Sequence, residues 1–304
     1  MTEVTETAQQ LQHGDVVRLL SLCEFPDEKA APQLNCAVSG GADSLALLAL
    51  ACATGRPVVA HHVDHGLRAT SSNDAKVVED ACDRFGADCV IIKVELDDGP
   101  NLEARARAVR IDALPTDALF GHTADDQAET MLINLIRGAG PSGMAAMTNE
   151  RHPILALRRA QTHALCETLG LSPVQDETND SPRFLRNRIR QEVIPLLDEV
   201  AKRDVVGVLA RQSGVFGQEA RFMDSLAEGI DATDARKLAE IHPVIAKRAL
   251  RLWLAERLDA EAHPPGQECL ARAMEVATGE ATSCDLVGGF RLCRTNQRLR
   301  IEAP

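Results

Sequence analysis

The chain has 304 residues, of which 45% are hydrophobic and 26% are charged, and its formal net charge is −12 with a pI near 5.2. This composition is ordinary for a globular protein, and the length predicts one large domain with a smaller one, because single cores stop growing near ~250–300 residues. No apolar run approaches the ~18 residues of a membrane span and the N-terminus is polar, so we expect a cytoplasmic protein without a membrane partner.

Nine cysteines are distributed singly along the chain, and none forms a C-x-x-C pair. This spacing argues against a zinc ribbon, an iron–sulfur cradle or a thioredoxin-like site, and the odd count argues against a disulfide framework. The acidic net charge argues against a nucleic-acid partner, but the argument is weak because binding depends on local patches. The distribution of arginines therefore has to be considered separately.

Strand-like and helix-like patterns alternate between about residue 34 and residue 157. Such alternation predicts βαβ units and a parallel sheet, with ligands at the carboxyl ends of the strands. The expected fold class is therefore α/β. The expected strands span residues 34–38, 57–62, 89–96 and 118–121, and the expected helices include residues 45–52, 72–85, 101–114 and 124–137.

After about residue 180 the strand patterns stop, and long helices are predicted over residues 182–200, 204–229 and 242–258. A hairpin is predicted near the C-terminus, over residues 284–301, after a Pro-Pro-Gly break that begins at Pro264. We therefore expect a catalytic domain over residues 1–200, followed over residues 201–304 by a helical linker and a small C-terminal domain.

A Gly-rich loop joins the first predicted strand to the first predicted helix. Its two glycines let the backbone approach an anion closely, and the amides of the loop and of the first helical turn would point at a phosphate. No lysine follows, as it would in a Walker A loop; Asp43 stands there instead, which suits a carboxylate that holds Mg²⁺ beside polyphosphate. The expected nucleotide-binding residues are Ser39, Gly40, Gly41, Ala42, Asp43 and Ser44.

The pattern Ser-Gly-Gly-x-Asp-Ser resembles the pyrophosphate loop (PP-loop) of the ATP pyrophosphatase superfamily, whose members split ATP between the α and β phosphates. The alternative is an ordinary glycine turn between a strand and a helix. Five fixed residues in a strand–loop–helix context favour the nucleotide-binding interpretation.

A second motif runs from Gly121 to Thr130, and it begins where a predicted strand ends. Its polar residues include His122, Asp126 and Glu129. Thr123 and Asp126 also fit a capping box, in which the acid completes a helix N-terminus, and taken alone the motif favours that structural role. Its expected position at the same sheet edge as the Gly-rich loop favours a functional one.

Six blocks of the sequence, in order, resemble those of the tRNA(Ile)-lysidine synthetases, over roughly residues 34 to 200. The phosphate loop is common to the whole superfamily, whereas the His-Val-Asp-His-Gly-Leu-Arg and Arg-Asn-Arg-Ile-Arg blocks are typical of this one family. The blocks cover residues 37–44, 62–68, 101–107 with Arg110, 121–130, 137–144 and 186–190.

The resemblance implies a PP-loop domain of the adenine nucleotide α-hydrolase-like fold and a two-step reaction. ATP with Mg²⁺ adenylates the C2 oxygen of the wobble cytidine in a tRNA(Ile) with a CAU anticodon. The amine of free L-lysine then attacks C2 and expels AMP, which gives lysidine. The implied partners are this tRNA and lysine, and a homodimer is an open alternative.

The residues of the motifs suit that chemistry. We expect Asp43 to contact the metal, Arg110 to stabilise phosphate, and His122 and Asp126 to contact the cytidine and handle protons, because a lysine amine with an ordinary pKa of ≈ 10.4 must lose a proton to attack. Other charged residues are expected to bind lysine or cytidine, although a plain surface ion pair between residues 103 and 107 is equally compatible with their spacing. These are Glu103, Arg107 and Glu129.

Basic residues near the end of the matched region are expected to contact tRNA, although a solvated helix face is the competing interpretation. The arginines of the predicted hairpin, from Arg291 to Arg300, form a second candidate phosphate-binding strip. The residues expected to contact tRNA are Arg137, Arg186, Asn187, Arg188 and Arg190.

The chain departs from the family pattern after Arg110, where Ile111 replaces the usual tyrosine and the segment up to His122 is shorter by about two helical turns. Two other enzymes of the superfamily are alternatives: a tRNA thiolase, disfavoured by the lack of C-x-x-C, and a small-molecule amide-forming synthetase. A nucleotide-binding regulatory module without turnover is a third alternative, disfavoured by the presence of Asp43, His122 and Asp126.

Overall fold

The computed structural model describes residues 11–64, 71–94, 102–174, 184–258 and 265–304. The chain divides into two compact units, which are described separately below. The first comprises Met1–Ala139 and Gly143–Gly214, and the second comprises Gly140–Ser142 and Val215–Pro304. The division therefore falls at Gly214, inside a single long helix.

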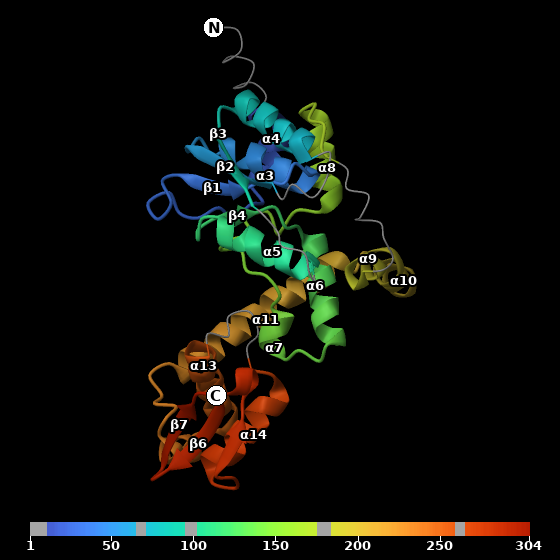
Figure 1. Cartoon of the computed structure of the whole chain (residues 1–304). Coiled ribbons are helices and arrows are strands. Elements are labelled where there is room, and N and C mark those ends of the chain that lie inside the picture. The colour runs from blue at the N-terminus through green and yellow to red at the C-terminus, as the bar shows by residue number, and fades with distance from the viewer. Residues whose placement is uncertain (1–10, 65–70, 95–101, 175–183, 259–264) are drawn as a thin grey trace. The chain divides into compact units, whose positions relative to one another are not determined.

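A parallel four-stranded sheet forms the centre of the first unit (Figure 1). Its strands are β1 (Leu34–Ala37), β2 (Val58–Asp64), β3 (Asp88–Lys93) and β4 (Leu119–Phe120), in the order β3-β2-β1-β4. Each pairing is parallel, and β4 contributes two residues, opposite Cys36 and Ala37 of β1. The predicted α/β fold with a parallel sheet is thereby confirmed.

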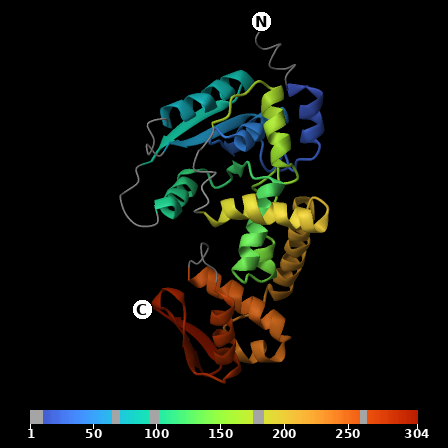
Figure 2. The same cartoon turned by 90° about the vertical axis from the view of Figure 1, so that its right-hand side faces the viewer.

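Helix α3 (Ala42–Cys52) occupies the core of this unit, and every residue from Leu45 to Ala51 is fully buried. A helix that is apolar on all sides has no face suited to water, so α3 is covered by the sheet and by other helices. Figures 1 and 2 show α4 (Ser71–Phe85) and α8 (Arg159–Thr168) beside α3 on one side of the sheet. The apolar side chains of β1, β2, α3, α4 and α8 form one continuous cluster.

The remaining helices of the first unit include α2 (Gly14–Leu20), α5 (Leu102–Ala113) and α6 (Ala124–Ile136), the last ending where Gly138 adopts a φ of +74°. The helix predicted over residues 182–200 consists of α9 (Leu185–Arg188), a π-helical turn (Ile189–Val193) and α10 (Ile194–Ala201). The π-helical turn ends two residues before Pro195, which has no N–H to continue the regular ladder.

Two helices contain residues of both units. One is the short helix α7 (Pro141–Met144), and the other is the long helix α11 (Val206–Ala227). The second unit itself contains α12 (Ala235–Glu240), α13 (Pro243–Arg257) and α14 (Gln267–Thr278). These helices share an apolar core with an antiparallel sheet of order β5-β6-β7. The strands are β5 (Ser283–Asp285), β6 (Arg291–Thr295) and β7 (Arg298–Glu302), with a 3₁₀ turn (Val287–Gly289) before β6.

The predicted C-terminal hairpin over residues 284–301 is confirmed, and it consists of three strands, β5, β6 and β7, rather than two. Asn296 and Gln297 connect β6 to β7 with φ values of +50° and +63°, the pattern of a two-residue hairpin turn of type I′. None of the helices in the described residues combines the length and the apolar content that crossing a membrane requires.

Candidate active site

The Gly-rich loop forms a tight turn between β1 and α3. Gly40 has a φ of +88°, which L side chains rarely adopt. The Ser44 hydroxyl donates to the Gly41 carbonyl (2.9 Å) and accepts from the Ser39 amide (3.1 Å), so the turn is closed by its own residues. Within the described residues no side chain caps α3, whose N-cap is Gly41. The first amides of α3, from Ala42 onward, are therefore placed to receive an anion.

The second motif meets this loop backbone to backbone. Gly121 follows β4, and a Cβ atom built on it would lie 2.7 Å from the Asp43 carbonyl oxygen and 3.0 Å from the Ser44 Cα. No side chain larger than hydrogen fits that space without a shift of the backbone. The structure thus brings the two motifs together at one edge of the sheet, as the sequence predicted.

Asp126 has the capping role that its sequence context suggested, and its second oxygen binds an arginine. Its Oδ2 accepts from the Thr123 amide (2.9 Å) and hydroxyl (3.0 Å), which completes a capping box at the start of α6. Its Oδ1 faces the other way and accepts from Nη2 of Arg159 at 2.9 Å. The neighbouring His122 packs edge-on against the ring of His152, with ring centroids 4.9 Å apart. The cap therefore fixes the Asp126 carboxylate while one of its oxygens faces the site.

Glu129, one turn along α6, is enclosed by arginines. Its side chain has no exposed surface, and its Oε1 accepts from Nε of Arg190 (2.7 Å) and Nη1 of Arg159 (3.2 Å). Its Oε2 accepts from Nε of Arg186 (3.0 Å) and Nη2 of Arg190 (3.1 Å). A ligand that reached this carboxylate would have to displace at least one guanidinium.

Helix α8, which the sequence analysis did not predict, supplies much of this arrangement. Arg158 binds the Asp125 carboxylate through two bonds, Nε to Oδ2 at 3.0 Å and Nη2 to Oδ1 at 3.1 Å. The Thr162 hydroxyl donates to Asp43, and Arg159 lies between the loop and α6. The spacing of buried Thr162, Leu165, Cys166 and Leu169 is helical and could have revealed this element.

The pKa values of Asp43 and Asp126 are shifted in opposite directions. Burial and the nearby charge of Asp126 raise the pKa of Asp43 above its ordinary value, although the Thr162 hydroxyl and Arg159 lower it in part. Burial also acts upward on Asp126, but the Arg159 guanidinium and the Thr123 amide outweigh it and hold the pKa of Asp126 below its ordinary value. Asp43 is thus a carboxylate that would gain from an added cation, whereas Asp126 is already neutralised.

This difference bears on Mg²⁺. Among the described residues, no group of three or more histidine, cysteine, aspartate or glutamate side chains is arranged to hold a metal ion. A magnesium ion at Asp43 would therefore take most of its ligands from phosphate and water, which is how Mg²⁺ usually binds in nucleotide sites. The partly exposed Asp43 carboxylate fits that role because it lacks a full counter-charge of its own.

The Arg-Asn-Arg-Ile-Arg block is divided between the interior and the surface. Arg186 and Arg190 face Glu129, and Asn187 is buried. Arg188 points outward, has 57% of its side chain exposed and pairs with Glu192 at 2.8 Å. Arg137 is the exposed C-cap of α6. The predicted tRNA-contacting residues are therefore not equivalent.

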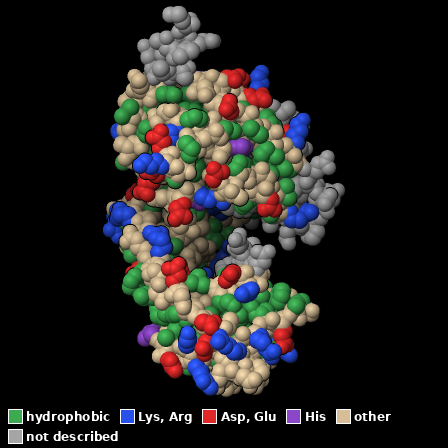
Figure 3. All heavy atoms as spheres, turned by 90° about the vertical axis from the view of Figure 1, so that its left-hand side faces the viewer, with side chains coloured by type: hydrophobic (Ala, Val, Ile, Leu, Met, Phe, Trp, Pro, Cys, Tyr) green, Lys and Arg blue, Asp and Glu red, His purple; other side chains and the backbone are tan. Residues whose placement is uncertain are grey.

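Arg110 lies exposed in the last turn of α5. The side chains of Glu103 and Arg107 fall outside the described residues, as do residues 65–68 of the second block. In the second unit, the arginines of the hairpin are partly neutralised, since Arg291 pairs with Asp285 (3.1 Å) and Arg298 with Asp231 (2.6 Å). Figure 3 shows basic side chains on this unit mixed with acidic ones.

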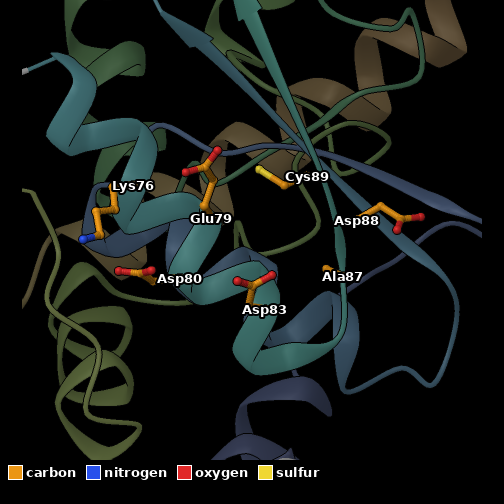
Figure 4. Close-up of a pocket in the computed structure, with 7 residues that line it drawn as sticks. All are labelled: Lys76, Glu79, Asp80, Asp83, Ala87, Asp88 and Cys89. Carbon is orange, nitrogen blue, oxygen red and sulfur yellow. The ribbon is translucent and has the colours of Figure 1, made fainter.

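A hollow of about 710 Å³ elsewhere in the first unit has a different character (Figure 4). It lies between α4 and β3 and is lined by Glu79, Asp80, Asp83 and Asp88, with Lys76 at one end. Figure 4 shows the first three of these acids projecting from α4. A surface of this charge would repel phosphate, so the hollow is not a candidate nucleotide site.

Comparison with known proteins agrees with the geometry. A family model described as a PP-loop domain matches residues 15–197. The tRNA(Ile)-lysidine synthase of Nocardia farcinica (strain IFM 10152) is 41% identical over 302 residues, which is 90% of this chain and 92% of that protein. The tRNA(Ile)-lysidine synthase of Salinispora arenicola (strain CNS-205) is 35% identical and covers 93% of this chain and 94% of that protein.

Among solved structures, the U34-tRNA thiolase NcsA from Methanococcus maripaludis with its 4Fe-4S cluster is similar with a TM-score of 0.47 and 16% identity, covering 70% of this chain and 79% of that chain. At that distance the similarity carries no argument about chemistry. The parallel sheet, the phosphate loop and the match over residues 15–197 define a PP-loop protein of the ATP-using class. Within that class, the chain belongs to the tRNA(Ile)-lysidine synthase family.

Proposed function

We propose that this chain is an ATP-dependent ligase that joins free L-lysine to C2 of the wobble cytidine of tRNA(Ile) with a CAU anticodon. The reaction passes through an adenylated cytidine and releases AMP and diphosphate. The observation that carries the proposal is the contact of the phosphate loop with the second motif at Gly121, beside Asp126. An activated phosphate and an acceptor group can be held next to each other only where such elements meet.

The nucleotide would be held by residues 39–44. The amides at the start of α3 would bind the diphosphate portion, and Asp43 would contact its Mg²⁺. The cation supplies neutralisation of the charge that builds on the departing diphosphate. Arg110 would add a guanidinium to a phosphate group. The exposed position of Arg110 in α5 leaves its side chain able to reach a ligand.

The acceptor side would be formed by His122 and Asp126. Asp126 is ionised at neutral pH because its pKa is depressed, so it suits accepting a hydrogen bond from the cytidine amino group. An ionised carboxylate of low pKa is a weak base, and proton removal from the amine is therefore assigned to His122. Glu129 would act through the arginines that it binds, while Glu103 and Arg107 are proposed to contact lysine or cytidine.

The tRNA would contact the exposed basic residues Arg137 and Arg188, with Arg186, Asn187 and Arg190 forming the supporting layer beneath. Such contacts bind phosphate and position the tRNA without reading its sequence. We also propose that the enzyme acts in the cytoplasm, where its substrates are found, and a homodimer is the alternative to a monomer.

A thiolase would need a reactive cysteine, and the environment of several cysteines opposes that. Burial raises the pKa of Cys23, Cys52 and Cys166 to about 12. Because the thiolate is the reactive form, these three thiols are unsuited to carry a persulfide. Replacing each cysteine in turn by serine tests the point, since a thiolase would lose activity in at least one variant.

The decisive experiment is incorporation of labelled lysine. The purified protein is given ATP, Mg²⁺ and a tRNA(Ile) transcript with a CAU anticodon, beside a tRNA(Met) transcript as control. Label in tRNA(Ile) alone is the expected result. AMP released in the presence of tRNA without incorporation of label would keep the adenylation step and exclude lysine as the nucleophile. Absence of both products would overturn the proposal.

A further inference from the structure

The Arg159 guanidinium touches both halves of the site at once. Its Nη2 lies 2.9 Å from Oδ1 of Asp126, its Nη1 lies 3.2 Å from Oε1 of Glu129, and its Nε lies 3.6 Å from Oδ2 of Asp43. Asp43 belongs to α3, and the two other carboxylates belong to α6. Arg159 thus connects the nucleotide loop to the acceptor side through one side chain from α8.

The three contacts are unequal. The two with α6 are within hydrogen-bonding distance, whereas the contact with Asp43 is longer and is an attraction between charges without a hydrogen bond. The Arg159 backbone amide is also fixed, because it donates to Oδ2 of Asp125 at 2.8 Å. Loss of the Asp43 contact would therefore leave the arginine anchored on α6.

Asp43 has a separate neutral partner. The Thr162 hydroxyl, one turn along α8 and fully buried, donates to Oδ1 of Asp43. One oxygen of the carboxylate is thereby held by an uncharged group, and the other faces Arg159. The Asp43 side chain is 25% exposed, so its charge is incompletely screened by water.

We propose that Arg159 is a positioning residue that acts as the built-in counter-ion of Asp43 in the nucleotide-free protein, and that Asp43 exchanges this partner for the divalent cation that accompanies ATP. Arg159 then keeps its bonds to Asp126 and Glu129. The inference rests on the proposed function in one respect, the use of ATP with a divalent cation. It adds a residue of α8 to the machinery and couples occupancy of the loop to the acceptor side.

The test is Arg159→Met, studied by thermal unfolding of the full chain with Mg²⁺ alone and without ATP or tRNA. Removing the guanidinium leaves Asp43, Asp126 and Glu129 short of positive charge. We expect the variant to unfold at a lower temperature than the wild type and to regain stability as Mg²⁺ is added at constant ionic strength. Half of that gain should occur at a Mg²⁺ concentration at least roughly tenfold below any effect on the wild type.

Arg158→Met is the matched control, because this neighbour on α8 pairs with Asp125 and Asp204 and not with Asp43. It should also unfold earlier, but Mg²⁺ should not restore it. A purely structural role of Arg159 predicts the same behaviour for both variants, and that result would overturn the proposal. The double variant D43N/R159M should lose the Mg²⁺ effect, and retention of the full effect would place the cation elsewhere and also overturn it.

If Arg159→Met does not fold, Arg159→Lys replaces it. A lysine ammonium keeps one positive charge but cannot reach three carboxylates, so we expect a smaller Mg²⁺ effect of the same sign, and its absence would count against the proposal. None of these measurements requires tRNA or turnover. A Mg²⁺ effect without incorporation of lysine would leave this inference standing and remove the proposed function, and the opposite pair of results would do the reverse.

Discussion

The phosphate loop lies beside a carboxylate–guanidinium cluster, but the two are built in different ways. The cluster consists of Asp126, Glu129, Arg159, Arg186 and Arg190. The loop is made of six consecutive residues. Its geometry depends on a positive φ at Gly40 and on the hydrogen bonds of the Ser44 hydroxyl with the backbone of Ser39 and Gly41. The cluster is made of side chains that are distant in sequence, since Glu129 meets Arg159 and Arg190, which are 30 and 61 positions away. One part is local backbone, and the other is tertiary structure.

The two parts are therefore sensitive to different substitutions. Backbone amides carry no net charge, and the hydrogen bonds of the Ser44 hydroxyl close the loop, so its conformation does not depend on a charged partner. Buried charges are stable only when they are paired with opposite charges, and removing one member of the cluster leaves its partners uncompensated. We therefore expect changes in the loop to affect chemistry before stability, and changes in the cluster to affect stability first.

The largest effect is expected for Asp43→Ala in the loop. AMP formation should fall by at least about 10²–10³-fold, because the diphosphate loses the cation that neutralises its developing charge. Thermal stability should change little. Glu167→Ala, an exposed acid on α8, is the control. Near-normal turnover in the Asp43 variant, measured by AMP release, would remove the metal role.

In the cluster, Glu129→Gln should destabilise the fold by about 3–5 kcal/mol, because three arginines lose their shared buried counter-charge. Urea unfolding measures this loss. Glu192→Gln breaks the exposed pair with Arg188 and should leave the unfolding midpoint unchanged. Equal stability of the two variants would mean that burial of the cluster does not matter.

Gly121→Ala tests the contact between the two motifs. The new Cβ would lie 2.7 Å from the Asp43 carbonyl oxygen, so the backbone must shift, at a cost of about 1–3 kcal/mol and with weaker ATP binding. Gly214→Ala is the control, since it lies inside α11 with nothing within 4 Å of the new atom, and it should be neutral or stabilising. Unchanged ATP affinity in the Gly121 variant would show that the contact between the two motifs does not affect ATP binding.

Arg188→Ala should raise the Michaelis constant for tRNA more than that for ATP. It should also reduce, by about 1, the slope of the logarithm of the tRNA-binding constant against the logarithm of the salt concentration. Adding Arg190→Ala should also lower stability, because that side chain binds Glu129. Glu192→Gln frees Arg188 and should act in the opposite direction on tRNA binding. Equal effects of Arg188→Ala on tRNA and ATP would assign this arginine to the fold or the catalytic centre.

The smallest effect is on the pH dependence of unfolding. The pKa of Asp126 is depressed in the fold, so its contribution to stability is present above its ordinary value of 3.8 and is lost as the pH falls through the folded value. The pKa of Asp43 is raised, so its contribution is present at low pH and is lost as the pH rises through the folded value.

Urea unfolding between about pH 3 and pH 7 separates the two aspartates. Asp126→Asn should be less stable than the wild type at neutral pH and should lose less stability in acid. Asp43→Asn should be more stable at neutral pH, with a difference that shrinks as the pH falls. The same sign for both variants at neutral pH would contradict the opposite shifts.

The same contrast explains what could be predicted from the sequence. The loop, the second motif and the strands that carry them were predictable because their signals are local: two glycines, a capping box and apolar alternation. The positions of Arg186 and Arg190 were not, because a run of arginines gives no sign of which members turn inward. Their orientation depends on Glu129, a residue of another helix.

The position of Arg159 in the site was missed for a related reason. Its helix begins with a polar stretch, so the periodicity of α8 becomes visible only further along, at Leu165 and Leu169. In the second unit, α14 was likewise unpredicted, although its apolar residues complete the core beneath the hairpin. These helices are recognisable mainly from the apolar residues that they pack against, and those residues are distant in the sequence.

The complete burial of α3 has a consequence for hydrogen exchange. The residues from Leu45 to Ala51 have no exposed surface, so their amides can reach solvent only when the core itself opens. The loop ahead of Ala42 is attached to this helix, whose buried amides we expect to exchange slowly. Local opening can therefore free the residues before Ala42, while the helix that aims its amides at the phosphate stays fixed until the unit unfolds.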